Sequence, residues 1–187
     1  VINYLESKYS SDSRKGIYHT FEIKDDRPNR RYSGTSQSTV YQKLLEYIKF
    51  LLNNNEEIAV MSHDGSSSFY HFLLKNNIKP ILLNNTCANE REIINNYLKV
   101  KKLYCTAGHS QMSAHALDLD YFTLISHPKV EYFLRDTNRY DKENYSYVND
   151  KDLVYNLKKG YNKIFKNYYK PANNNLVSII MMFDKTL

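Results

Sequence analysis

The feature of this sequence that most constrains its fold is an alternation between short β-favouring segments and helical segments. Residues 16–23 and 57–61 are short apolar runs, which are typical of strands. From Val40 to Leu52, leucine, isoleucine and valine recur every three or four residues, which predicts an amphipathic helix. Further strands are predicted at residues 78–83, 103–105 and 121–125, and further helices at residues 69–75, 89–99 and 111–117. This alternation favours an α/β or α+β fold with a mixed β-sheet flanked by helices.

The length of the chain predicts a single domain. Its 187 residues fit one domain, residues 1–187, and 42% of them are hydrophobic, which is enough for a sizeable core. Residues 126–152 are mostly polar and are predicted to form an irregular segment. Residues 153–170 combine lysines with apolar residues at helical spacing, so we expect a basic helix near the C-terminus.

Charge and cysteine content narrow the classes of partner and location. The net charge is +6, which favours polyanionic partners such as nucleic acid or phosphorylated ligands. Two cysteines cannot make a disulfide framework, and no four-ligand zinc spacing occurs, so a cytoplasmic, reducing location is expected. The sequence has no run of 18 apolar residues, so no transmembrane segment is predicted, and it has no signal-peptide pattern at its start.

Three charged residues near the start of the chain suggest a metal site. Glu22 and Lys24 fall on one face of the strand predicted at residues 16–23, because strand side chains alternate with period two. Asp12 can return to that face from a neighbouring strand or turn. Two carboxylates and an ammonium group at one place can hold a divalent cation, Mg²⁺ or Mn²⁺, together with a phosphate.

This pattern of an acid, a spacer and then Glu-Ile-Lys at the end of an apolar strand resembles the restriction-endonuclease-like nucleases of the PD-(D/E)xK type. The resemblance covers roughly residues 1–62 and includes a predicted return strand at residues 31–33. It implies that Asp12 and Glu22 hold the metal and that Glu22 and Lys24 are catalytic. The implied activity is the metal-dependent hydrolysis of phosphodiester bonds in nucleic acid.

Two loops with similar sequences are candidates for phosphate binding. Residues 62–68 and 105–111 each place a glycine and then a serine between a predicted strand and a predicted helix, where backbone N–H groups suit an anion. The second loop resembles the cysteine-phosphatase loop, with Cys105 at the nucleophile position. Ser68 and Gln111 stand where that family has its arginine, so binding without phosphatase activity is expected. The predicted phosphate-binding residues are Gly65, Ser66, Ser67, Gly108 and Ser110.

Two further patterns bear on function. The basic helix predicted at residues 153–170 interleaves lysines with aromatic residues, which suits contact with a nucleic-acid backbone and equally an ordinary surface helix. Asp118-Leu119-Asp120 resembles the metal-binding pair of nucleotidyltransferases. The predicted nucleic-acid-binding residues are Lys158, Lys159, Lys163, Lys166 and Lys170.

Three functional hypotheses follow from these patterns. The sharpest is a metal-dependent nuclease that uses Asp12, Glu22 and Lys24. The second is a non-catalytic module that binds phosphate or a nucleotide through the loops at residues 62–68 and 105–111. The third is a viral or phage interaction protein without chemistry, whose contact surfaces use its 18 tyrosines.

Overall fold

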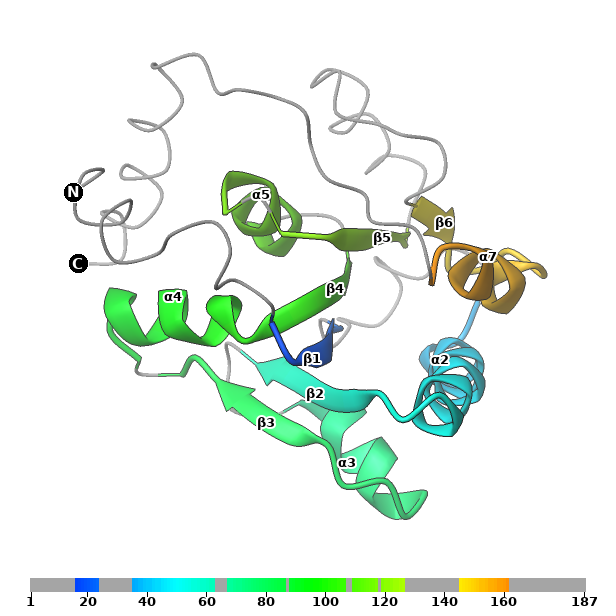
Figure 1. Cartoon of the computed structure of the whole chain (residues 1–187). Helices are drawn as coiled ribbons and strands as arrows, with labels where there is room; N and C mark the ends of the chain where they lie inside the picture. The colour runs from blue at the N-terminus through cyan, green and yellow to red at the C-terminus, as the bar shows by residue number, and fades with distance from the viewer. Residues whose placement is uncertain are drawn as a thin grey trace.

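The computed structural model describes residues 16–23, 35–62, 67–86, 88–106, 109–117, 119–126 and 145–161. Within this part of the chain, a six-stranded sheet carries helices on both faces (Figure 1). The elements in chain order are β1 (Tyr18–Glu22), α2 (Gln37–Asn53), β2 (Glu57–Ser62), α3 (Ser68–Lys75), β3 (Ile81–Asn84), α4 (Glu90–Leu98), β4 (Val100–Thr106), α5 (His109–Ala116), β5 (Tyr121–Ile125), β6 (Tyr145–Tyr147) and α7 (Leu153–Lys159). The predicted α/β fold with a helix-flanked sheet is confirmed.

The strands lie in the order β3-β2-β1-β4-β5-β6, and each described pairing between neighbours is parallel. The chain therefore moves outward from β1 to β3 and then crosses back to place β4 on the other side of β1. Parallel neighbours require a crossover connection, which explains why a helix follows each of the strands β1 to β4. The sheet of the described residues is thus parallel throughout and doubly wound, with its order reversing between β1 and β4.

Two groups of buried side chains hold the helices against the two faces of the sheet. On one face, Phe21 packs in a cluster with Leu44 of α2, Leu73 of α3 and Leu157 of α7. On the other face, residues of α4 and α5 pack against β2, β4 and β5. Figure 1 shows α2, α3 and α7 on one side of the sheet and α4 and α5 on the other. Successive residues of β1 therefore contact different helices, because strand side chains alternate between faces.

The helices begin and end at residues whose chemistry explains the boundaries. Ser36 is the N-cap of α2, and its hydroxyl accepts a hydrogen bond of 3.2 Å from the backbone N–H of Thr39. Asn55 and Asn77 follow α2 and α3 with φ of 59° and 60°, a left-handed conformation that asparagine tolerates well. In the part of the chain that the structure describes, no helix combines the length and the apolar character needed to cross a membrane.

The last described elements differ in part from the predictions. The segment predicted to be irregular, residues 126–152, contains the short strand β6, which pairs with β5. Three residues with alternating burial are too short a run for periodicity to reveal. The helix predicted at residues 153–170 begins at Leu153 as α7 but ends at Lys159, with Gly160 as its C-cap, so α7 is shorter than the predicted helix. Residues 162–170 and the predicted return strand at residues 31–33 lie outside the described residues.

Candidate functional site

The carboxyl ends of the parallel strands form one end of the sheet, and four of the described strands end there in polar residues, among them the three neighbours β2, β1 and β4. Glu22, Ser62 and Thr106 are the last residues of β1, β2 and β4. Glu22 pairs in register with Cys105 of β4, one residue before Thr106. In doubly wound sheets, ligands bind outside the carboxyl ends of the strands, where the strand order reverses. That reversal lies between β1 and β4, so these residues mark the candidate site.

Glu22 is a buried carboxylate that two helices hold in place. Its side chain is 2% exposed. The Tyr97 hydroxyl of α4 donates a hydrogen bond of 3.3 Å to Oε2, and the Ser110 hydroxyl of α5 donates to Oε1. Burial, together with the neighbouring charge of Glu22, raises the pKa of Tyr97 well above its usual value, so this hydroxyl stays protonated and remains a donor. The orientation of the carboxylate is therefore set by two side chains from different elements.

The hydroxyl groups of Ser62 and Thr106 are buried and have no hydrogen-bond partner within the described part of the molecule. Each residue is 4% exposed. The register of β1, continued by two residues against β2 and by one residue against β4, places Ser62 and Thr106 opposite Ile23, on either side of β1. A buried hydroxyl without a partner costs roughly 1–3 kcal/mol, so a pair of them at a strand end requires a physical explanation.

A third polar group at the same end of the sheet is also incompletely bonded. Asn85 directly follows β3 and is 5% exposed. Its Oδ1 accepts a hydrogen bond of 2.7 Å from the Asn96 amide of α4, whereas its own Nδ2 has no partner. The carboxyl ends of β2 and β4, with the residues that follow β3, therefore present three hydroxyls, of Ser62, Thr86 and Thr106, and the Asn85 amide to an added group.

The residues predicted to form a nuclease site are only partly described. Glu22 lies at the carboxyl end of β1, whereas Asp12 and Lys24 lie outside the described residues. Among the residues that the structure does describe, no group of three or more histidine, cysteine, aspartate or glutamate side chains is placed to hold a metal ion. Glu22 is thus the one member of the predicted set whose surroundings can be stated.

Two serines of the predicted phosphate-binding set lie within the described residues, and the hydroxyl of each forms a hydrogen bond to another residue of the chain. Ser67 is the N-cap of α3, where its hydroxyl accepts a hydrogen bond of 3.2 Å from the N–H of Tyr70. The Ser110 hydroxyl donates to Glu22. Gly65, Ser66 and Gly108 lie outside the described residues. The structure therefore assigns Ser67 and Ser110 supporting roles beside the two loops.

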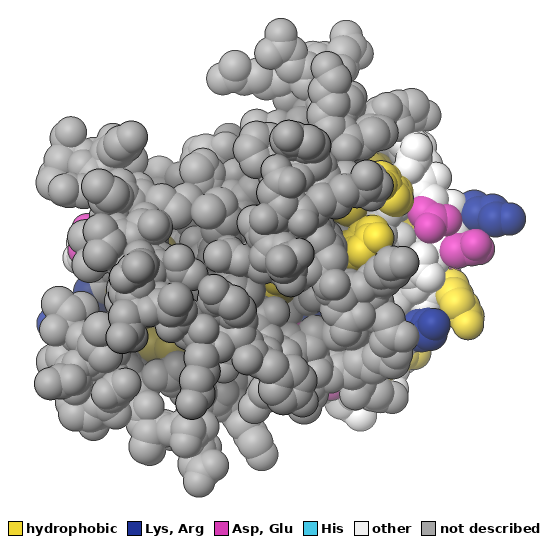
Figure 2. Space-filling model, turned by 90° about the horizontal axis from the view of Figure 1, so that it is seen from above, with side chains coloured by type: hydrophobic (Ala, Val, Ile, Leu, Met, Phe, Trp, Pro, Cys, Tyr) yellow, Lys and Arg dark blue, Asp and Glu magenta, His cyan; other side chains and the backbone are white. Residues whose placement is uncertain are grey.

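The described part of the predicted nucleic-acid-binding helix carries two lysines and no acidic residue. Lys158 forms an ion pair of 3.3 Å with Glu46 of α2, and its ammonium lies 5.6 Å from the centre of the Phe50 ring. Lys159 is exposed. Figure 2 shows acidic and basic side chains next to each other at the α7 margin of the molecule. Lys163, Lys166 and Lys170 lie outside the described residues.

Charged residues at the amino end of the sheet, among those described, have partners as well. Lys102 is buried, pairs with Asp120 at 3.2 Å and donates a hydrogen bond of 2.8 Å to the Gly160 carbonyl. Burial lowers the pKa of Lys102, and Asp120 opposes that shift. Asp120, part of the predicted Asp-x-Asp pair, therefore stands directly before β5, at the opposite end from Glu22. Asp118 lies outside the described residues.

Reasoning from the sequence missed Ser62 and Thr106 as site residues, although both fall within the two predicted loops. Their sequence signal is a hydroxyl side chain at the last position of a buried strand, on each side of β1. Tyr97 was missed because a tyrosine within an amphipathic helix is indistinguishable from a core residue until its partner is known.

Comparisons with known proteins do not assign a family. No protein-family model matches the sequence, no curated protein matches it and no solved structure matches the fold. The resemblance to PD-(D/E)xK nucleases therefore stays a prediction. Conclusions about function rest on the geometry at the carboxyl end of the sheet.

Proposed function

We propose that the chain is a binding module for a phosphorylated ligand, such as a nucleotide, which lies at the carboxyl end of the sheet beside Ser62 and Thr106. The observation that carries the proposal is the pair of buried hydroxyls without partners at the point where the strand order reverses. A ligand with several acceptor oxygens would accept hydrogen bonds from both hydroxyls. The net charge of +6 favours an anionic ligand over a neutral one.

The position of these hydroxyls distinguishes them from another unpartnered hydroxyl. Thr123 is 1% exposed and its Oγ1 also has no partner, but it lies in the middle of β5. A ligand outside the carboxyl ends of the strands would contact Ser62 and Thr106 and would leave Thr123 untouched. Thr123 therefore provides a matched control, with the same chemistry at a different place in the sheet.

The test is calorimetric titration of pyrophosphate and of nucleoside di- and triphosphates into the wild-type protein and three variants. We expect Thr106→Val and Ser62→Ala each to raise the Kd about tenfold or more, because each removes one hydrogen bond to a charged group. Thr123→Val should leave the Kd unchanged. A wild-type protein that binds none of these ligands, or a Thr123→Val variant as impaired as the other two, would contradict the proposal.

A metal-dependent nuclease is the second proposal, because the buried carboxylate of Glu22 lies at the same end of the sheet as the two hydroxyls. Asp12 and Glu22 would hold Mg²⁺ or Mn²⁺, which activates water for phosphodiester hydrolysis, and Lys24 would neutralise charge on the phosphate. Tyr97 and Ser110 would orient the Glu22 carboxylate. The lysines from residue 158 onward would contact the nucleic acid.

Incubation of nucleic acid with the protein and Mn²⁺ tests this second proposal. The wild-type protein should cleave the substrate, and Glu22→Gln should abolish cleavage while the protein remains folded by circular dichroism. Cleavage that persists in Glu22→Gln would remove Glu22 from the site. If the wild-type protein does not cleave the nucleic acid, the nuclease proposal is ruled out and the binding-module proposal is unaffected.

The proposed location is cytoplasmic and reducing. The low cysteine content supports this location, because two cysteines in 187 residues cannot make the disulfide framework of a secreted domain. Labelling of intact and lysed cells with a thiol reagent that does not cross membranes would test it: the protein should react only after lysis and denaturation.

A further inference from the structure

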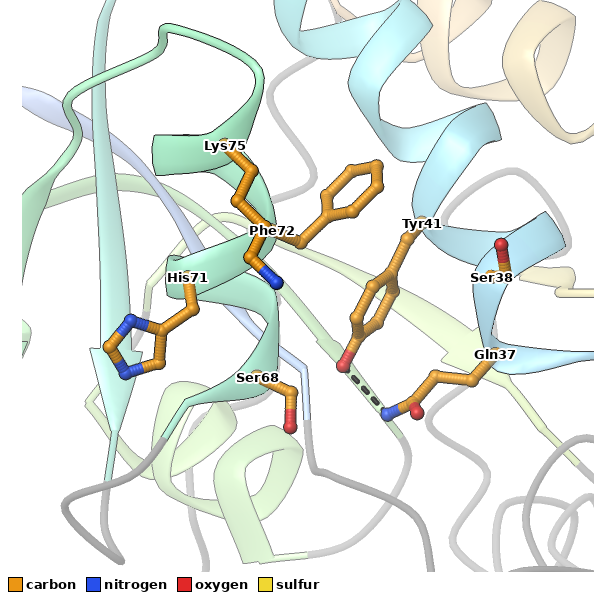
Figure 3. Close-up of a pocket in the computed structure, with 7 residues that line it drawn as sticks. All are labelled: Gln37, Ser38, Tyr41, Ser68, His71, Phe72 and Lys75. Atoms are coloured by element: carbon orange, nitrogen blue, oxygen red, sulfur yellow. Dashed lines mark hydrogen bonds between the residues drawn. The ribbon is translucent and has the colours of Figure 1, made fainter.

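A pocket of about 400 Å³ lies between the first turn of α2 and one face of α3. Its α3 side is a stripe of residues one helical turn apart, which places them on a single face. Figure 3 shows the Lys75 side chain and the Ser68 hydroxyl lying on the side of α3 that faces Tyr41, while the His71 ring points away from Tyr41. The lining residues are Gln37, Ser38, Tyr41, Ser68, His71, Phe72 and Lys75.

The chemistry of this lining favours an anion. Lys75 is exposed and has no hydrogen-bond or ion-pair partner among the described residues, and the lining contains no acidic side chain. Ser38 and Ser68 add hydroxyl groups, and the Gln37 amide donates a hydrogen bond of 2.7 Å to the Tyr41 hydroxyl. Helical side chains lean toward the helix N-terminus, so the Lys75 ammonium turns back toward Ser68.

The pocket lies on the same face of the sheet as the proposed ligand. Its helices α2 and α3 cover the face on which Ile58 and Val60 of β2 are buried. Ser62 follows Val60 by two positions, so its side chain projects to that face as well. The helix α3 begins with its N-cap at Ser67, shortly after β2 ends, so the Ser68 end of the pocket is the end nearer the carboxyl end of the sheet.

We propose that this pocket is the anion subsite of the ligand, in which the Lys75 ammonium binds a phosphate group. The proposal rests on the proposed binding function and adds where the phosphate lies and which side chain neutralises it. The volume of the pocket is of the size that holds a small organic ligand, for which such sites span about 300–1,000 Å³. A different role for Lys75 is stabilisation of the last turn of α3, where a cation favours the negative helix end.

Lys75→Met separates these two roles, because it keeps the aliphatic stem and removes the charge. Lys79→Met is the matched control, since Lys79 is also exposed and follows α3 in the connection to β3. Pyrophosphate is the probe, with binding measured by calorimetry and stability by thermal unfolding. We expect Lys75→Met to raise the Kd for pyrophosphate about tenfold or more, while Lys79→Met retains the wild-type Kd.

The outcomes distinguish the subsite from the proposed function. If Lys75→Met binds pyrophosphate like the wild-type protein while Thr106→Val and Ser62→Ala bind it more weakly, the subsite is overturned and the binding module stands. If Lys79→Met weakens binding as much as Lys75→Met, general charge and not the pocket attracts the anion, which also overturns the subsite. If the wild-type protein does not bind pyrophosphate, the subsite is overturned, and the binding module fails with it only if the nucleoside di- and triphosphates do not bind either.

Discussion

His19 is a buried histidine at the amino end of the sheet, and its surroundings keep the imidazole neutral. Burial lowers its pKa to about 4, although the carboxylate of Glu56 lies 3.3 Å from Nε2 and opposes the shift. The Tyr104 hydroxyl lies 2.9 Å from Nδ1 and 2.8 Å from the Tyr47 hydroxyl. Burial raises the pKa of Tyr104 well above its usual value, so that hydroxyl stays protonated and can hydrogen-bond to the neutral ring and to Tyr47.

Glu56, the other residue in contact with His19, is held in its ionised form. Burial opposes the charge of Glu56, but hydrogen bonds from Lys101 at 2.6 Å and from Tyr161 at 2.7 Å hold the pKa of this carboxyl below its usual value. His19 therefore lies in a network that favours a neutral imidazole beside a charged carboxylate. A proton on His19 would place a buried positive charge near Lys101 and Lys102. A proton on Glu56 would remove the charge that accepts the hydrogen bonds from Lys101 and Tyr161.

This network predicts that the protein loses stability in mild acid. The pKa of His19 is 6.5 when unfolded and about 4 when folded, so the unfolded chain takes up the proton first as the pH falls. The free energy of unfolding should be fully present above pH 6.5 and decline toward pH 4, by about 3 kcal/mol from His19 alone. The lowered pKa of Glu56 acts in the same direction. Urea unfolding at a series of pH values measures the decline.

His19→Phe tests whether this histidine is the cause. The variant should show a shallower decline between pH 6.5 and 4 than the wild-type protein. The control is His71→Ala, which removes an exposed histidine on α3 and should leave the decline unchanged. Equal slopes in the wild-type protein and in His19→Phe would show that other groups govern acid sensitivity.

At the scale of elements, hydrophobic spacing located the helices and most strands because burial depends on that spacing. The apolar residues from Val40 to Leu51 point to one side of a helix, and α2 buries that side. The run Asn53-Asn54-Asn55 indicated a helix end, and Asn55 adopts the left-handed conformation that ends α2. Such local signals act within a few residues of one another, so they are visible in the sequence.

The pairing of strands was harder to predict from the sequence, because it depends on contacts between residues far apart in the chain. The sequence predicted a mixed sheet, whereas all described pairings are parallel, since each apolar run was consistent with either direction. Likewise, Ser110 of the predicted phosphate loop contacts Glu22, which is 88 positions away in the sequence. Spacing could not predict which charged or polar residues would meet at one end of the sheet.

At the scale of the whole molecule, the doubly wound order gives the two ends of the sheet different chemistry. At the amino end, the neutral His19 lies beside Glu56, and Glu56 and Lys102 form ion pairs with Lys101 and Asp120. At the carboxyl end, the hydroxyls of Ser62 and Thr106 are buried without partners among the described residues. We therefore assign a structural role to the charged network at the amino end and propose ligand binding at the carboxyl end.

The most direct test of this account is a titration of the isotope-labelled 22.1 kDa protein with pyrophosphate, followed through backbone amide NMR shifts. We predict shift changes at residues next to Ser62 and Thr106 and along α3 from Ser68 to Lys75, with the signals around His19 and Lys101 unchanged. Changes confined to the amino end of the sheet or to α7, or no changes at saturating pyrophosphate, would contradict a ligand site at the carboxyl end.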